Sequence, residues 1–333
     1  MSSYSVPYGQ QVHFENPRVL PSATTSSLTL NKRDHATAVH VNVACYTAAE
    51  TIELISQAGE LKGAMRPEKT FFSAVSAGCL LAFAAAANLR AQASPWLIDN
   101  APGLNGLIGA MVFPMGLVWI VLTGAELFTD VIMYTIVAAL QGKLKLWQLA
   151  RQWFLCFWGN LAGTLFVMIV ILGYGGVFQE EPFFSTMQAA ATNKQLLPTW
   201  YQIFLRGIGC NWLVCLACFH GMQGKDLVSK TVGIWWPMFA FTHLGLDHVV
   251  ANMSYIPMGI FLGTPKLTVG LYVLKGVIPV LFGNILGGGL FVGTYYWWMY
   301  LCGSSDLTAD ATLSETDTKL PTKLELRRGY EHA

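Results

Sequence analysis

Two ionisable side chains stand in the middle of an apolar stretch, where such groups often carry chemistry. Asp247 and His248 lie next to each other within the run 232–262. An imidazole titrates near neutral pH and can accept or donate a proton, and ionisable residues at mid-span depth are functional candidates by default. We therefore predict that His248 handles a proton inside the protein. For His243 a functional and a structural role stay equally open, and we expect His220 to be structural.

A second apolar run, 104–140, also contains acidic residues, Glu126 and Asp130. We interpret these carboxylates as partners for the backbone N–H groups that a helix break sets free. Both runs exceed the ~20 residues of one membrane crossing, so each is expected to form a broken helix. The breaks are predicted at 123–126 and 242–248, where glycine and polar residues replace the apolar pattern.

The composition places these runs in a membrane. Of 333 residues, 53% are hydrophobic and only 12% are charged, whereas soluble domains carry about 25% charged residues. A net charge of +1 gives no reason to expect a nucleic-acid partner. The seven cysteines lack the paired spacing of a zinc site or a disulfide framework. We expect neither a metal nor a cofactor.

Six hydrophobic units make up a membrane domain over 69–303, and the segments on either side of it are more polar. A polar tail at 1–48, expected to be disordered, and an amphipathic surface helix at 49–68 precede it, and a charged tail at 304–333 follows. Six spans place both termini on one side. Lysine and arginine gather in the connections of that side, which predicts cytosolic termini in a multi-pass protein of the plasma membrane. The units are 69–91, 104–140, 147–178, 198–221, 229–262 and 270–303.

The two halves of this domain repeat each other. Each half contains three spans, and because three is odd, the second half must enter the membrane from the opposite side. Broken helices of such inverted repeats meet near the midplane, where irregular backbone persists only if it lines a cavity. The breaks therefore mark a permeation path. The matching segments are 113–115 with 236–238 and 159–163 with 283–287, within repeats at 69–178 and 198–303.

Three segments closely resemble signatures of the formate/nitrite transporter family. They are GLVWIVLTGAELFT at 116–129, FTHLGLDHVVANMSYIPMGI at 241–260 and GNILGGGLFVG at 283–293. The resemblance covers residues 58–303 and implies an all-α, aquaporin-like protomer in a homopentamer. Each protomer would have its own pore for formate, nitrite, lactate or related anions. The long polar tails resemble the fungal nitrite-uptake branch, so nitrite is favoured and formate comes next.

The resemblance also implies roles for individual residues. Phe113 and Phe241 fall at the outer constriction of the family, and Leu117 falls at the inner one. His248 falls at the central pore histidine, and Asn211 at the asparagine that holds it. The full implied set is His248, Asn211, Asp247 and Thr129 for the pore and proton relay, Phe113, Phe241, Leu117 and Leu127 for the constrictions, and Lys194 and Lys62 for attracting anions at the two mouths.

The free-energy costs of the two ways of crossing favour a proton-linked mechanism. Moving a bare anion into a low-dielectric constriction costs tens of kcal/mol by the Born estimate. Neutralising a weak acid of pKa about 3.5 at pH 7 costs only about 5 kcal/mol, at about 1.36 kcal/mol per pH unit. We expect Lys194 and the N-termini of the half-helices to attract the anion, and His248 to supply or relay a proton. The neutral acid then passes Phe113, Phe241 and Leu117.

Two other functions are weighed against transport of anions. A neutral-solute channel of the aquaporin class shares the inverted repeat, but its paired Asn-Pro-Ala loops are absent from this sequence. A membrane haem oxidoreductase would use His220, His243 and His248 as axial ligands, yet two haems need four such histidines. We therefore expect a transporter rather than an enzyme. Its partners are a small anion, H⁺, the lipid bilayer and further copies of the chain.

Overall fold

A computed structural model of the chain describes residues 45–303. Within this range the regular secondary structure is helical, apart from an isolated bridge between Cys45 and Gly224. The predicted all-α membrane fold is confirmed. The predicted tail 304–333 and nearly all of the tail 1–48 lie outside the described residues.

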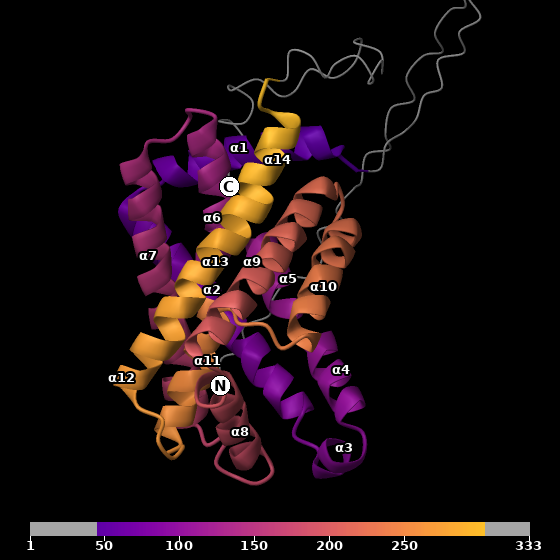
Figure 1. The fold of residues 1–333 in the computed structure, drawn as a ribbon, viewed down its shortest axis with the longest axis vertical. Coiled ribbons are helices and arrows are strands. Elements are labelled where there is room, and N and C mark those ends of the chain that lie inside the picture. The colour runs from indigo at the N-terminus through magenta and orange to yellow at the C-terminus, as the bar shows by residue number, and fades with distance from the viewer. Residues whose placement is uncertain (1–44, 304–333) are drawn as a thin grey trace, which may run out of the picture. The chain divides into compact units, whose positions relative to one another are not determined.

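The first helix, α1 (Ala48–Ala64), precedes the first span and lies across one end of the bundle (Figure 1). A capping box starts it, because Thr47 Oγ1 accepts from the Glu50 N–H while Glu50 Oε2 accepts from the Thr47 N–H at 2.7 Å. Ile52 and Ile55 are fully buried, and α1 packs mainly against α6. The predicted surface helix 49–68 thus corresponds to a helix with one face packed on the bundle, and its place at a membrane surface stays a prediction.

Six spans follow, close to the predicted units. Five helices in the described range are long and apolar enough to cross a membrane, and the fifth span, which is split, completes the set. The third span ends at Gly173 rather than at 178, because the chain turns there. The spans are α2 (Pro67–Ala91); α4 (Pro102–Val112), α5 (Met115–Thr123) and α6 (Phe128–Leu140); α7 (Leu146–Leu165) with the π-helical η1 (Phe166–Gly173); α9 (Trp200–Gln223); α10 (Leu227–His243) and α11 (Val249–Phe261); and α12 (Val269–Leu271), η2 (Tyr272–Val277), α13 (Ile278–Gly288), η3 (Gly289–Thr294) and α14 (Tyr295–Tyr300).

Two helices were not predicted, α3 (Pro95–Asn100) and α8 (Phe183–Gln195). Both lie at the end of the bundle opposite α1 (Figure 1). Each sits in a connection between spans, where the sequence is too polar to read as a membrane crossing. We call this end of the bundle the α3/α8 end.

The second and fifth spans are broken, as predicted. The backbone leaves the helix between α5 and α6 and again between α10 and α11. Each break contains a glycine in the left-handed conformation, Gly124 at φ 69° and Gly245 at φ 67°, which residues with a Cβ rarely adopt. The second span has a further kink at Pro114, between α4 and α5, where the ring removes a backbone donor.

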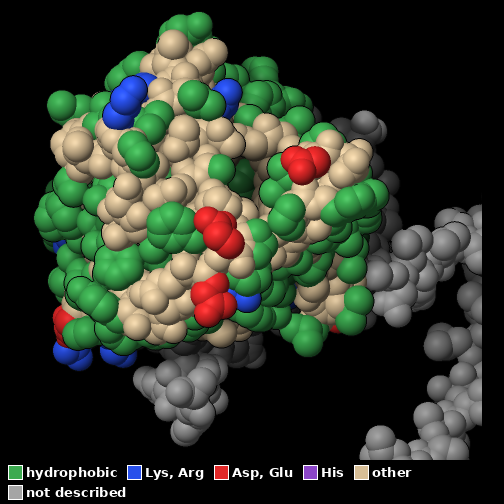
Figure 2. All heavy atoms as spheres, turned by 90° about the horizontal axis from the view of Figure 1, so that it is seen from below, with side chains coloured by type: hydrophobic (Ala, Val, Ile, Leu, Met, Phe, Trp, Pro, Cys, Tyr) green, Lys and Arg blue, Asp and Glu red, His purple; other side chains and the backbone are tan. Residues whose placement is uncertain are grey.

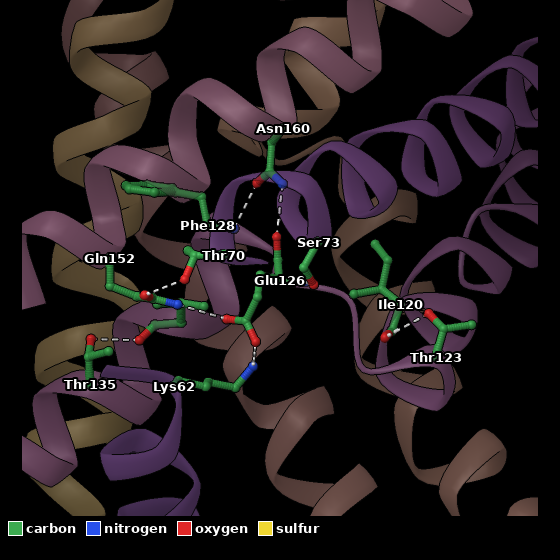
Figure 3. A network of polar contacts seen from close by, with 11 residues as sticks. Lys62, Thr70, Ser73, Ile120, Thr123, Glu126, Phe128, Thr135, Gln152 and Asn160 are labelled. Carbon is green, nitrogen blue, oxygen red and sulfur yellow. Dashed lines mark hydrogen bonds and ion pairs between the residues drawn. The ribbon is translucent and has the colours of Figure 1, made fainter. Parts of the chain in front are cut away.

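An asparagine of the third span holds the chain at the first break (Figure 3). Asn160 Oδ1 accepts from the Phe128 N–H at 2.8 Å, and its Nδ2 donates to the carbonyl oxygens of Glu126 at 2.9 Å and Ala74 at 2.8 Å. Asn160 is fully buried. One side chain therefore satisfies the first N–H of a half-helix and ties the break to α2.

The sixth span repeats this arrangement at the second break. Asn284 Oδ1 accepts from the Val249 N–H at 2.9 Å, and its Nδ2 donates to the carbonyl oxygens of Asp247 at 3.1 Å and Gly207 at 2.8 Å. The asparagines that matched in the sequence repeat thus make matching contacts in space. The repeat predicted from the sequence is therefore also present in the structure.

Glycines beside these asparagines bring the spans close enough for the contacts to form. A Cβ on Gly163 of α7 would collide with the carbonyl oxygen of Val75 in α2. A Cβ on Gly287 of α13 would collide with that of Ile208 in α9. Small residues let helix backbones approach closely in membranes, so the Gly-x-x-x-Gly spacings are packing seams, as predicted.

We expect Asn160→Ala to destabilise the protein strongly. The change removes the partner of the Phe128 N–H and of the Glu126 carbonyl, and each buried unsatisfied group costs about 1–3 kcal/mol. The unfolding temperature of the detergent-purified protein should fall, by an amount equivalent to about 2–4 kcal/mol. Asn100→Ala is the control, because exposed Asn100 donates its side-chain bond to the Trp96 carbonyl within its own helix. Equal unfolding temperatures for the two variants would contradict this role of Asn160.

Candidate functional site

A cavity of about 440 Å³ opens at the α3/α8 end, bounded by α2, α8, α9, α10 and α11. Figure 2 views this end and shows a hollow near the middle of the face. The walls combine cations, amides and aromatic rings. Among the lining residues are Lys194, Arg206, Asn88, Gln92, Tyr255, Phe113 and Phe241. We call this cavity the vestibule.

Two phenylalanines close the inner side of the vestibule. Phe113 and Phe241 are 2% and 3% exposed, and their rings meet edge to face with centroids 5.5 Å apart. The ring of His248 lies beyond them, 6.1 Å from that of Phe241. The structure therefore brings together the two residues predicted to form the outer constriction. Leu117 and Leu127, predicted for the constrictions as well, are buried.

His248 is buried and both of its ring nitrogens have partners. Nδ1 lies 3.0 Å from the backbone nitrogen of Ala251, and Nε2 lies 2.8 Å from Thr129 Oγ1. A backbone N–H only donates, so Nδ1 must accept and the ring proton is assigned to Nε2. His248 is therefore a neutral imidazole here, fixed in one tautomer, and it donates to Thr129.

Asn211 was expected to hold this histidine, but its partner is different. Asn211 Nδ2 donates to the Thr129 carbonyl at 3.1 Å and to the Asn284 carbonyl at 2.7 Å. The direct partner of His248 is the Thr129 hydroxyl, in the first turn of α6. Asn211 thus fixes the backbone of the residue that holds the ring. The spacing in the sequence did not distinguish which polar residue of two neighbouring helices reaches the imidazole.

A buried ion pair stands beside the second break. Lys194 of α8 places Nζ 3.2 Å from Asp247 Oδ1 and 3.1 Å from the Leu246 carbonyl. Asp247 is fully buried and also accepts from Asn252 Nδ2 at 3.2 Å. The ammonium lies 5.9 Å from the ring centroid of Tyr255. Lys194 is in the vestibule, as expected, but Asp247 compensates its charge.

A matching ion pair stands beside the first break (Figure 3). Lys62 of α1 places Nζ 2.7 Å from Glu126 Oε1, and Gln152 Nε2 donates to Glu126 Oε2 at 3.1 Å. Lys62 also lies 5.1 Å from the ring centroid of Tyr134. Each half of the protein therefore supplies a lysine from the helix before it, a carboxylate in the break and a tyrosine further along the half-helix.

The predicted role of Glu126 as a backbone partner is wrong. Its carboxylate is used by Lys62 and Gln152, while its own N–H donates to Ser73 Oγ at 3.2 Å. An ammonium stabilises a buried carboxylate more than a backbone amide does, because both groups are charged. Asp130 lies in the first turn of α6, and its Oδ1 has no hydrogen-bond partner among residues 45–303.

The match to known proteins settles the class of this molecule. The formate/nitrite transporter family model matches residues 49–298. The chain belongs to the formate/nitrite transporter family. It is 35% identical to a probable formate transporter of Methanothermobacter thermautotrophicus, over 76% of this chain and 96% of that protein. It is 30% identical to the formate channel FocA of Escherichia coli strain K12, over 76% and 94%.

Solved structures of the family share the fold. A pentameric formate channel with formate bound has a TM-score of 0.63 and 30% identity, over 71% of this chain and 98% of that one. An ion channel of the family has a TM-score of 0.68 and 25% identity, over 75% and 98%. The chain is thus a multi-pass membrane protein of a transporter and channel family, as the sequence indicated.

Two features of this family member were missed or left open by the sequence. Arg206 lines the vestibule, and an arginine near the start of an apolar span could have signalled it. His243 is exposed, and its ring stacks on that of Phe239 at 5.8 Å between centroids. His243 therefore lies apart from the contacts of His248.

We expect Glu126→Ala to destabilise the protein, because Lys62 then keeps a mostly buried charge without a partner. Breaking a buried ion pair from one side costs about 3–5 kcal/mol. The double change Lys62→Met with Glu126→Gln should recover most of that loss in unfolding temperature. Glu68→Ala, which removes the exposed pair with Arg66, is the control and should change little. A double variant as unstable as Glu126→Ala would show that the pair itself is not the cause.

Proposed function

We propose that this chain conducts small monovalent anions of weak acids, with nitrite and formate as substrates, and that they cross the constriction as neutral acids. The observation that carries the proposal is the order of groups along the path. A vestibule with cationic walls ends at two packed phenylalanine rings, and a neutral, fully partnered imidazole lies behind them. A bare anion is costly between such rings, whereas a neutral acid is not.

The substrates follow from charge and size. The two relatives and one of the solved structures are named for formate, whereas the polar tails of this chain favour nitrite. Both ions carry one negative charge and two oxygens. A short apolar constriction between rings separates them poorly, so we include both.

Lys194 is proposed to offer a donor to the anion in the vestibule. An ammonium has three N–H donors, and two of them are used by Leu246 and Asp247. The third is available to an anion. Because Asp247 compensates the charge, the anion is not held as a tight ion pair. Loss of water near Phe113 and Phe241 then raises the proton affinity of the anion.

His248 is proposed to exchange the proton through Nδ1. Ala251, whose N–H occupies Nδ1, lines the vestibule, so this side of the ring faces the incoming anion. Uptake of a proton from water in the vestibule at Nδ1 opens the bond to Ala251 and makes the ring an imidazolium. When the Nδ1 proton passes to an anion oxygen, the neutral Nε2–H tautomer returns and the Ala251 bond forms again. Thr129 accepts from Nε2 throughout.

We also propose that five copies assemble, each with its own pore, in the plasma membrane with both termini in the cytosol. The support is the likeness to a pentameric formate channel and the charge bias of the connections. Lys62 then faces the cytosolic mouth and Lys194 the opposite one. Mass measurement of the purified complex tests the assembly.

Transport by reconstituted protein tests the proposal. Proteoliposomes receive nitrite, formate, acetate and lactate in turn, and anion uptake and internal pH are recorded together. We expect nitrite and formate to enter with one proton each, and faster when the external pH is lowered, because the weak acid is then more readily neutralised. If none of the four anions moves, the assigned class of substrate is wrong.

We expect His248→Phe to abolish proton-linked uptake. The change removes both ring nitrogens of the imidazole behind Phe113 and Phe241, and a positioned proton donor contributes about 10²–10⁴-fold in rate. His243→Phe is the matched control, because that exposed ring stacks on Phe239, and it should retain wild-type uptake. Wild-type uptake by a correctly assembled His248→Phe variant would refute the relay.

A further inference from the structure

Arg206 is a cation of the vestibule whose charge is not compensated within the described part of the chain. It lies near the start of α9, is half-buried and lines the 440 Å³ cavity. Among residues 45–303, no hydrogen bond or ion pair engages its guanidinium. A guanidinium carries five N–H donors and stays charged at any physiological pH. Its donors are therefore available to a solute in the cavity.

The other charges at this end are occupied or lie outside the cavity. Lys194 is paired with Asp247 at 3.2 Å. Arg90 donates to the Val177 carbonyl and stacks on Phe183, 3.4 Å from the ring centroid. Within residues 45–303, no aspartate or glutamate lines the cavity. Arg206 therefore gives the interior of the vestibule a net positive charge.

Exposed acidic side chains lie on the surface around the cavity (Figure 2). Asp99 in α3 and Glu180 and Glu181 before α8 are exposed, and Figure 2 shows acidic side chains beside the hollow. Exposed carboxylates repel an approaching anion over about one Debye length, roughly 8 Å in physiological salt. A cation inside the cavity offsets that repulsion.

The pseudo-symmetry of the two halves shows that this arginine belongs to one mouth only. Asn160 binds the Ala74 carbonyl and Asn284 binds the Gly207 carbonyl, so Ala74 and Gly207 are equivalent positions. The residue before Gly207 is Arg206, and the residue before Ala74 is Ser73. Ser73 is neutral, and its hydroxyl accepts from the Glu126 N–H. The α1 end thus lacks a counterpart of Arg206 at this position.

We infer that Arg206 is the capture site for planar, two-oxygen monoanions in the vestibule, ahead of the phenylalanine constriction. Carboxylates and nitrite present two oxygens in one plane, which match two parallel N–H donors of a guanidinium. A spherical anion such as chloride gains the charge attraction but not the paired bonds. This inference rests on the proposed transport of weak-acid anions and names the residue that selects and concentrates them at one mouth.

The test is sided transport by Arg206→Gln in right-side-out and inside-out membrane vesicles, with nitrite and with formate. For entry from the α3/α8 end, we expect the apparent KM to rise about tenfold, which corresponds to about 1.4 kcal/mol, at an unchanged maximal rate. The wild-type KM should also rise with ionic strength, and this dependence should weaken in the variant. Entry from the α1 end should keep its KM.

Two further variants sharpen the result. Arg206→Lys keeps the charge but loses the planar fork, so it should retain the salt dependence and discriminate less between formate and competing chloride. Lys266→Gln removes one positive charge from an exposed loop between α11 and α12, outside the cavity, and should behave as wild type. If Arg206→Gln does not assemble, Arg206→Lys still tests recognition by paired bonds, through chloride competition measured from each side.

Several outcomes overturn the inference. A wild-type KM for Arg206→Gln from both sides would exclude capture by this residue, and an equal rise from both sides would indicate a structural role. Chloride competition unchanged in Arg206→Lys would exclude recognition by paired bonds. Failure of the wild-type protein to move any weak-acid anion would instead refute the proposed function, so the two failures are distinguishable.

Discussion

The structure depends on pairing the backbone groups that two broken helices leave free inside a membrane. Lipid offers no hydrogen bonds, so irregular backbone at that depth survives only where protein or a water-filled cavity satisfies it. Asn160 and Asn284 meet this demand, each with one acceptor for a half-helix N–H and two donors for carbonyls. Glycines in the same helices serve this pairing as well. They let neighbouring spans approach so closely that the short asparagine side chain reaches the backbone of the break.

Once the backbone groups of a break have hydrogen-bond partners, the break can hold an ionisable side chain at a fixed position. A carboxylate precedes each half-helix, and a lysine from outside the span neutralises it at 2.7 Å in the first half and 3.2 Å in the second. These pairs let charged groups stay buried close to the path.

Function arises where the two halves differ. The residue before α6 is Leu127 and the residue before α11 is His248, so one break contributes an apolar wall and the other an imidazole. Thr129 of the first half supplies the partner of that ring. The site therefore contains residues of both repeats, although each repeat has its own break, asparagine and ion pair. The two ends of the bundle also differ at equivalent positions of the repeats: Ser73 in the first half corresponds to Arg206 in the second.

The sequence by itself determined the six spans, both breaks and the repeat, because apolar length and glycine placement are local properties of the chain. It also singled out His248, whose ionisable ring is conspicuous in an apolar run. Only the tertiary structure decided that Thr129 rather than Asn211 contacts this ring, that Lys62 compensates Glu126, and that Arg206 reaches the vestibule. Those partners lie on different helices, and their contacts depend on helix rotation and packing distance, which no local pattern records.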